Sequence, residues 1–259
     1  AFFAAFAVKV PMWPVHTWLP DVHVEAPTGG SAVLAAIMLK LGAYGFLRFS
    51  LPIAPDAAHH YAPFIITLSL IAVIYVGLVA LVQKDMKKLV AYSSISHMGF
   101  VLLGIAAFNV EGWQGAIFQL VSHGILSSML FLMAGVLYSR TGNRDIDSYS
   151  GLASKMPVFT LISGVAIFAS LGLPGFSGFI GEFFSLMGSF TSPLLIPIYS
   201  ILGALGILLG AGYLLWTFQK VFLGTHYTLN ATWTMNDLTP TETLSLYSLG
   251  DRKSTRLNS

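Results

Sequence analysis

The sequence predicts an all-α polytopic membrane protein. Its 259 residues are 55% hydrophobic and only 9% charged, whereas roughly a quarter of the residues are charged in an ordinary soluble domain. With 13 basic and 11 acidic residues the chain could not cover a surface exposed to water, and its mean hydropathy of +0.76 agrees. Apolar stretches of about 20 residues, the length that crosses a bilayer as a helix, recur along the chain.

The composition also excludes several classes of function. The chain has no cysteine, which rules out disulfides, iron–sulfur ligation and zinc-thiolate sites within it. Its net charge is +2 and its basic residues are scattered, so it lacks the basic patch of a nucleic-acid-binding protein. We expect no cofactor, no metal ion and no nucleic-acid partner, and any electron transfer belongs to another chain.

Windows of about 20 apolar residues predict the spans in chain order. They cover residues 28–51, 61–82, 88–108, 112–139, 156–190 and 193–219. The apolar run at 1–8 is too short to span a bilayer and is expected to belong to a helix that begins before the chain does. With this partial helix the sequence predicts about seven transmembrane helices.

Two of these helices are predicted to be broken. The window 156–190 is too long for one straight span and contains the string LPGFSG at 173–178. Proline removes a backbone hydrogen bond and glycine relaxes the turn, so a break is expected there. The first span is interrupted in the same way by Pro11, Pro14 and Pro20.

The basic residues of the loops predict the orientation. When the loops alternate between two sides, Arg48 lies on one side and all the others lie on the opposite side: Lys84, Lys87, Lys88, Arg140, Arg144, Lys155 and Lys220. Loops rich in Lys and Arg stay on the cytoplasmic side, or on the matrix side in an organelle.

Lys40 is the residue most clearly out of place in an apolar span. It lies about twelve residues into its span, or about 18 Å by helix rise. A lysine at mid-bilayer costs about 2.5–3.5 kcal/mol on insertion scales, several times what one leucine returns. A snorkelling lysine needs a nearby membrane–water interface, and Lys40 is far from both interfaces of the bilayer. The position predicts a functional lysine.

Two histidines occupy the middle of consecutive spans. His97 has serines on its helix face, and His123 shares a face with Gln119 and Ser127 at four-residue spacing. A lone mid-helix histidine is most often a hydrogen-bonded packing residue. Two of them with polar neighbours suit a proton relay, because imidazole titrates between pH 5 and 8. Metal binding is the rival hypothesis, and it lacks a positioned carboxylate or cysteine.

Lys9 and Glu182 adjoin the two breaks. Broken helices expose backbone dipoles and admit water, and they commonly hold the ion site of a transporter. Glu182 is either a group poised for proton exchange or an interfacial residue that ends a short helix, and Lys9 is either a buried relay group or an interfacial lysine. The ionisable residues inside the spans predict a proton track along the midplane: Lys9, Lys40, His97, His123 and Glu182.

Several strings resemble the antiporter-like membrane subunits of respiratory complex I. They are KVP at 9–11, PVHTWLPD at 14–21, EAPT at 25–28, MLKLGAYG at 38–45, DMKKLVAYSSISHMG at 85–99, PGFSGF at 174–179 and GEF at 181–183. The most similar type is the M subunit, the bacterial counterpart of mitochondrial NADH dehydrogenase subunit four. The resemblance covers about residues 1–249, and strings of this length are highly specific.

The resemblance implies a fold and a role for each site residue. In this family fourteen helices form two inverted repeats, each with a broken helix that bears a key ionisable group, and the chain would run from the seventh helix to just short of the fourteenth. By this resemblance Lys9 is the lysine of the broken helix, Lys40 the central lysine, and His97 and His123 the connecting histidines. Glu182 is then the terminal acidic residue, which is a lysine in some sister subunits. The glutamate that pairs with the first lysine lies outside this fragment.

Three regions are expected along the chain. Residues 1–220 form a transmembrane antiporter-like domain that is truncated at its N-terminus. Residues 221–249 form a polar loop or amphipathic segment leading to a missing last helix. Residues 250–259 differ sharply in composition from the rest and are expected to be a non-native tail.

The leading hypothesis for function is a proton-translocating subunit of an NADH:quinone oxidoreductase, without a redox centre of its own and coupled to quinone reduction elsewhere. Its partners would be other membrane subunits of complex I, the lipid bilayer, protons and water. The alternatives are a subunit of a multisubunit sodium/proton antiporter and a membrane scaffold whose charges only anchor helices; the midplane lysine argues against the scaffold. The expected location is a bacterial plasma membrane, with the mitochondrial inner membrane as the alternative.

Overall fold

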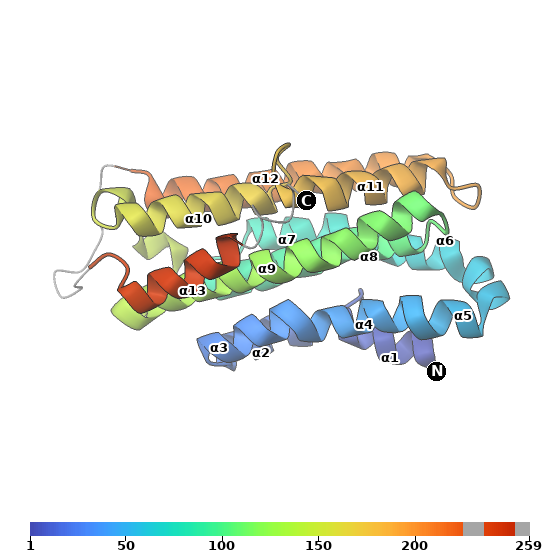
Figure 1. Cartoon of the computed structure of the whole chain (residues 1–259), viewed down its shortest axis with the longest axis horizontal. Coiled ribbons are helices and arrows are strands. Elements are labelled where there is room, and N and C mark those ends of the chain that lie inside the picture. Colours follow the sequence, from blue (N-terminus) through green and yellow to red (C-terminus); the bar gives the residue numbers. More distant parts are fainter. Residues whose placement is uncertain (225–235, 252–259) are drawn as a thin grey trace.

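The computed structural model describes residues 1–224 and 236–251, and most of these residues are helical. The helices lie side by side in three tiers (Figure 1). The first tier holds the helices from α1 to α5, the middle tier those from α6 to α9, and the third tier α10, α11 and α12. The described part of the chain forms no β-strand, which confirms the predicted all-α class.

Five helical stretches in the described residues are long and apolar enough to cross a membrane, and each coincides with a predicted window. They are Thr28–Ile53, Pro55–Leu81, Met86–Ile105, Val110–Thr141 and Ile198–Phe222. The first comprises α3 (Thr28–Val33), the π-helical η1 (Leu34–Met38), α4 (Leu39–Gly45), the π-helical η2 (Phe46–Ser50) and α5 (Leu51–Ile53). The second comprises α6 (Pro55–Ile71), the π-helical η3 (Ala72–Val76) and α7 (Gly77–Leu81). The others are α8 (Met86–Ile105), α9 (Val110–Thr141) and α12 (Ile198–Phe222).

Both predicted breaks are confirmed. The first separates α1 (Phe2–Lys9) from α2 (Trp18–Glu25), and the second separates α10 (Pro157–Ser170) from α11 (Ser177–Thr191). Pro11, Pro14 and Pro174 lie within the two breaks and have no N–H to donate, so the helical ladder stops there. The prediction was wrong for Pro20, which lies in the first turn of α2, where a missing N–H costs no helical hydrogen bond. Figure 1 shows α10 and α11 almost in line along the third tier. A total of seven spans follows if each broken pair counts as one, and that total stays a prediction.

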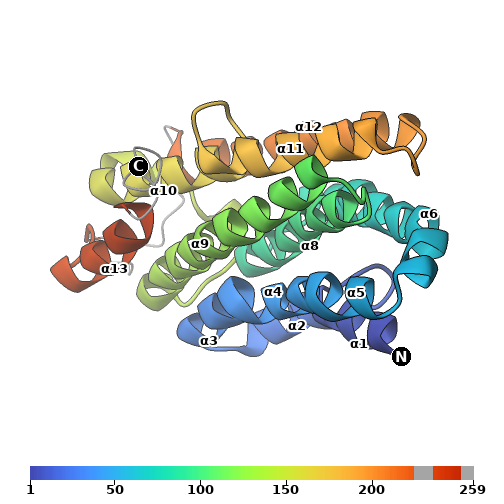
Figure 2. The ribbon, with the colours of Figure 1, turned by 45° about the vertical axis from the view of Figure 1, so that its right-hand side comes forward.

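Helices α8 and α9 form the centre of the molecule, between the two outer tiers (Figure 2). Nearly every residue of α8 is buried, and α8 packs against α9, α2, α6, η3, α7 and α11. In turn α9 packs against α3 and η1 on one side and against α11 on the other. The close approach to α11 depends on small residues: a Cβ atom on Gly181 would lie 2.8 Å from Cα of Gln119.

One end of the molecule, which we call the basic end, is formed by the loops 82–85 and 142–156 and by the last turns of α9 and α12. The two loops pair through backbone hydrogen bonds between Met86 N and Arg144 O and between Ile146 N and Lys84 O. Further side-chain ion pairs join Arg144 to Asp85 at 3.2 Å and Lys220 to Asp147. Arg48 lies in η2, beside α5 at the opposite end (Figure 1). The predicted asymmetry of basic residues therefore follows the two ends of the molecule.

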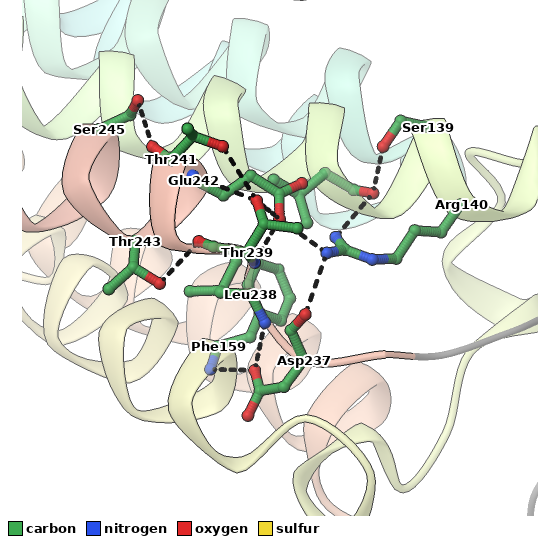
Figure 3. A network of polar contacts seen from close by, with 11 residues as sticks. Ser139, Arg140, Phe159, Asp237, Leu238, Thr239, Thr241, Glu242, Thr243 and Ser245 are labelled. Atoms are coloured by element: carbon green, nitrogen blue, oxygen red, sulfur yellow. Dashed lines mark hydrogen bonds and ion pairs between the residues drawn. The ribbon is translucent and has the colours of Figure 1, made fainter.

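A network at the basic end holds the C-terminal described segment, α13 (Pro240–Asp251), against α9 and α10 (Figure 3). The Arg140 guanidinium lies 2.8 Å from a Glu242 carboxylate oxygen and also donates to the Asp237 carbonyl. The Asp237 carboxylate accepts from the backbone N–H groups of Val158 and Phe159 at 3.0 and 3.1 Å. Asp237 thereby caps the first turn of α10, whose own N-cap residue makes no side-chain cap.

The helix α13 lies in the segment 221–249 that the sequence predicts to be a polar loop or amphipathic stretch, and it extends to Asp251. Residues 225–235 of that segment and residues 252–259 of the predicted non-native tail lie outside the described residues. The predicted boundaries of the three regions stay predictions.

Candidate functional site

Lys40 is placed by the π-helical turn η1, which ends two residues before it. A π-helical turn holds one more residue than an α-helical turn and is frequent at functional sites. The half-buried Lys40 ammonium donates to the Ala35 carbonyl of this turn, and the Ser127 hydroxyl of α9 donates to the same oxygen at 3.4 Å. The ammonium therefore has a protein partner at the depth where lipid would offer none.

The Lys40 ammonium also reaches across to α9. Its Nζ atom lies 2.8 Å from Nδ1 of His123. An ammonium has no lone pair to accept with, so it is the donor here and a neutral His123 accepts on Nδ1. His123 is only 4% exposed, and its ring centroid lies 5.5 Å from that of His97 on α8.

The second contact joins His97 to Glu182. Nδ1 of His97 lies 3.0 Å from Oε1 of Glu182, and Gln119 donates to the same oxygen at 3.5 Å. His97 and Glu182 are 7% and 2% exposed. A carboxylate this deeply buried needs hydrogen-bond donors or a cation to offset the loss of water, and His97 with Gln119 supplies them. Glu182 is therefore a buried group of the bundle, which favours proton exchange over the interfacial alternative.

The glycine-rich break before α11 makes room for the Glu182 carboxylate. Gly172 has φ +70°, a conformation that glycine adopts without strain. A Cβ atom at Gly172 would overlap Oε2 of Glu182. The loop thus approaches the carboxylate more closely than any other residue type would permit.

Four of the five predicted site residues therefore lie in one continuous series, which we call the polar row: Lys40, His123, His97 and Glu182. The residues come from α4, α9, α8 and α11, so the row crosses the bundle from the first tier through the middle tier to the third. Each imidazole can take a proton on one ring nitrogen and release one from the other. The row is thus chemically able to pass protons between a lysine and a glutamate.

Lys9 is not joined to the polar row. It is the last residue of α1 and its side chain is exposed. Its ammonium makes no hydrogen bond to the residues that the structure describes. Its Cβ atom lies close to Gly42, so α1 packs on α4 one half-turn beyond Lys40. A relay role for Lys9 stays a prediction.

The serines near the two histidines on α8 and α9 are buried. Ser96 donates to the Val73 carbonyl at 3.1 Å, and the hydroxyls of Ser122 and Ser177 lie 2.9 Å apart. Their hydroxyls therefore bond to the walls of the bundle and do not bridge the members of the polar row. His23 of α2 is also fully buried, and no pattern in the sequence predicted it as a site residue.

In the described part of the chain, no group of three or more His, Asp or Glu side chains lies close enough to hold a metal ion. His97 and His123 have a single carboxylate, Glu182, near them, and the Lys40 ammonium occupies the other side of His123. A cation next to the metal would be unfavourable. The proton-relay hypothesis for the two histidines is thus better supported than metal binding.

Comparison with known proteins connects this site to a family. The family model described as "NADH:quinone oxidoreductase/Mrp antiporter, TM" matches residues 1–210. NADH-quinone oxidoreductase subunit M of Rhodobacter capsulatus is 53% identical over 224 residues, which are 86% of this chain and 43% of that protein. The subunit of the same name from Rickettsia bellii (strain RML369-C) is 56% identical over 224 residues, again 86% of this chain and 45% of that protein. The chain spans less than half the length of these two relatives.

Two solved structures have the same fold. A chain of respiratory complex I from Thermus thermophilus with bound NADH matches with a TM-score of 0.87 and 34% identity, over 97% of this chain and 52% of that chain. A chain of the Mrp complex from Dietzia sp. DQ12-45-1b matches with a TM-score of 0.80 and 24% identity, over 86% of this chain and 41% of that chain. The second likeness shows the fold alone.

Proposed function

The chain belongs to the NADH:quinone oxidoreductase/Mrp antiporter family of transmembrane proteins, and from this premise we propose that it is a proton-translocating membrane subunit of an NADH:quinone oxidoreductase. The observation that carries the proposal is the polar row, with its contacts of 2.8 Å between Lys40 and His123 and 3.0 Å between His97 and Glu182. Relatives at 53% and 56% identity bear the name of that enzyme's M subunit.

In this proposal the row works by successive proton transfers. Lys40 gives a proton to Nδ1 of His123, which releases the proton of its other ring nitrogen toward His97. His97 in turn delivers a proton to the Glu182 carboxylate through Nδ1. The 5.5 Å between the two ring centroids leaves the step between the histidines to ring rotation or to one intervening water.

The driving force would come from outside the chain. Without cysteine the chain cannot ligate an iron–sulfur cluster, and we propose that it holds no redox centre. Electron transfer to quinone elsewhere in the complex would alter the charge that Lys40 experiences, and so the affinity of the row for protons. Its partners would be the other membrane subunits of the complex, together with lipid, water and protons.

The chain is a multi-pass membrane protein, and we propose the bacterial plasma membrane as its location because the two relatives named above are bacterial. A subunit of a sodium/proton antiporter is the alternative function, since the family description includes the Mrp antiporter. The identities of 53% and 56% to oxidoreductase subunits, against 24% to the Mrp chain, favour the oxidoreductase.

The experiment is Lys40→Ala in the full-length subunit assembled in its complex. We expect proton translocation during NADH oxidation, measured with a pH-sensitive dye in membrane vesicles, to fall about tenfold or more, as for loss of a proton-transferring group. We expect the amount of assembled complex to stay near normal, because removal of a charge from mid-bilayer eases insertion. Normal proton pumping by the assembled variant would overturn the proposal. Transport of sodium ions in place of protons by the unmodified complex would favour the antiporter alternative.

A further inference from the structure

His23 is a buried ionisable group that the polar row does not use. It lies in α2, its exposed fraction is 0%, and neither of its ring nitrogens has a hydrogen-bond partner among the described residues. Its only close ring contact there is a parallel stack on Phe131 of α9, with centroids 4.2 Å apart. A buried polar atom without a partner is destabilising, so two on one ring call for an explanation beyond packing.

The helix α9 shows where His23 lies relative to the polar row. His123, Ser127 and Phe131 follow one another at four-residue spacing and therefore share one face. Since His123 contacts Lys40 and Phe131 stacks on His23, His23 lies about 12 Å beyond the polar row along α9. That direction leads toward Arg140 and the basic end.

Several polar groups lie in the interval between His23 and Lys40. Ser31 is fully buried and donates to the His23 carbonyl at 3.1 Å. Ala35 lies one turn further along the same span, in η1, and its carbonyl accepts from both Ser127 and the Lys40 ammonium. The interval between His23 and Lys40 therefore contains buried hydroxyl and carbonyl groups.

The opposite side of His23 leads to the surface. Lys87 is 3% exposed, and its ammonium donates at 2.9 Å to the carbonyl of Ala26, three residues beyond His23 at the end of α2. The same ammonium lies 5.9 Å from the centre of the Tyr138 ring. Tyr138 lines an open pocket of the basic end together with Lys84, Asp85, Asn143 and Arg144. The Tyr138 ring and the Lys87 ammonium thus connect this pocket to the end of α2, the helix that holds His23.

We propose that His23 carries protons between the pocket of the basic end and Lys40, and so supplies the polar row from that side. The step needs only water and a proton. A proton from pocket water forms an N–H bond on one ring nitrogen, and the N–H bond on the other ring nitrogen breaks as its proton moves toward the Lys40 amine, which has already given its own proton to His123. Rotation of the ring then restores the first state. The inference rests on the proposed function, because it assigns a source to the same row.

The test compares three substitutions of His23 in the full-length subunit within its complex. His23→Gln keeps the size and the hydrogen bonding but cannot exchange a proton at neutral pH. His23→Phe keeps a ring to stack on Phe131 and suits the buried site. His23→Glu supplies a different exchangeable proton between two lysines. The control is His59→Gln, because His59 also stacks on a phenylalanine, Phe108 at 4.1 Å, but is exposed.

We expect His23→Gln and His23→Phe to assemble and to lower NADH-driven proton translocation about tenfold or more, with His59→Gln unchanged. His23→Glu should recover a substantial part of the rate, with a changed pH profile. A packing role predicts the reverse order, with Phe best and Glu worst, and that order would overturn the inference. Normal pumping by an assembled Gln or Phe variant would also overturn the inference. If the His23 variants pump normally and Lys40→Ala does not, the inference about His23 fails and the proposed function stands. If Lys40→Ala also pumps normally, the proposed function fails as well.

Discussion

Nδ1 of His97 lies 3.0 Å from Oε1 of Glu182, which joins the central helix α8 to the half-helix α11 that follows the second break. The two residues are 85 positions apart in the sequence. Both are almost fully buried, so the contact has little competition from bulk water and its strength depends on the protonation state of each partner.

This contact predicts that Glu182→Gln damages pumping as severely as Glu182→Ala. The amide still accepts the hydrogen bond from His97 but cannot take up a proton at neutral pH. We expect about a tenfold or greater loss of NADH-driven proton translocation in assembled complex for both variants. Near-normal translocation by the Gln variant, beside a defective Ala variant, would make Glu182 a structural acceptor only.

Gly172→Ala should displace the Glu182 carboxylate. The substitution combines backbone strain at φ +70° with overlap between the new Cβ atom and Oε2 of Glu182, for a total cost of about 1–3 kcal/mol. The matched control is Gly175→Ala in the same break, where φ is +98° and the new Cβ meets nothing within 4 Å. We expect both variants to lower the thermal midpoint of the complex, and only Gly172→Ala to lower pumping strongly. Equal pumping by the two would show that the carboxylate tolerates the displacement.

Asp237→Ala should loosen the start of α10. Loss of an N-terminal cap costs about 0.5–2 kcal/mol, and Asp237 accepts from two of the free N–H groups of this helix. We expect faster hydrogen exchange at the amides of Val158 and Phe159, with exchange in α8 unchanged. Asp237→Asn keeps one acceptor and should give an intermediate rate. Protection that persists in the Ala variant would mean that water caps the helix equally well.

The spans and the breaks could be predicted from the sequence because composition and proline determine them locally. The predicted span 28–51 corresponds to the helical stretch Thr28–Ile53 in the structure. The predicted break around Pro174 corresponds to the end of α10 at Ser170. The residues of the polar row could be predicted because an ionisable group in an apolar span is costly wherever it points.

The pairing within the row could not be predicted in the same way. Helix α8 is buried all round, so its pattern does not say that His97 faces α11. The partner depends on how α11 packs against both α8 and α9, which is a property of the whole bundle. The π-helical turn η1, which places the Ala35 carbonyl, has no local pattern that would predict it. Capping of α10 by Asp237 could not be predicted either, because a capping side chain normally comes from a residue adjacent to the helix in the sequence.

The cap by Asp237 has a consequence for the order in which the protein matures. Asp237 follows Val158 by 79 positions and Phe159 by 78 positions in the sequence. A ribosome synthesises the N-terminal part of a chain first. While α11 and α12 are being synthesised, the Asp237 carboxylate is not yet available to the first amides of α10. The half-helix before the second break therefore reaches its final form after both of the helices that follow it have been made.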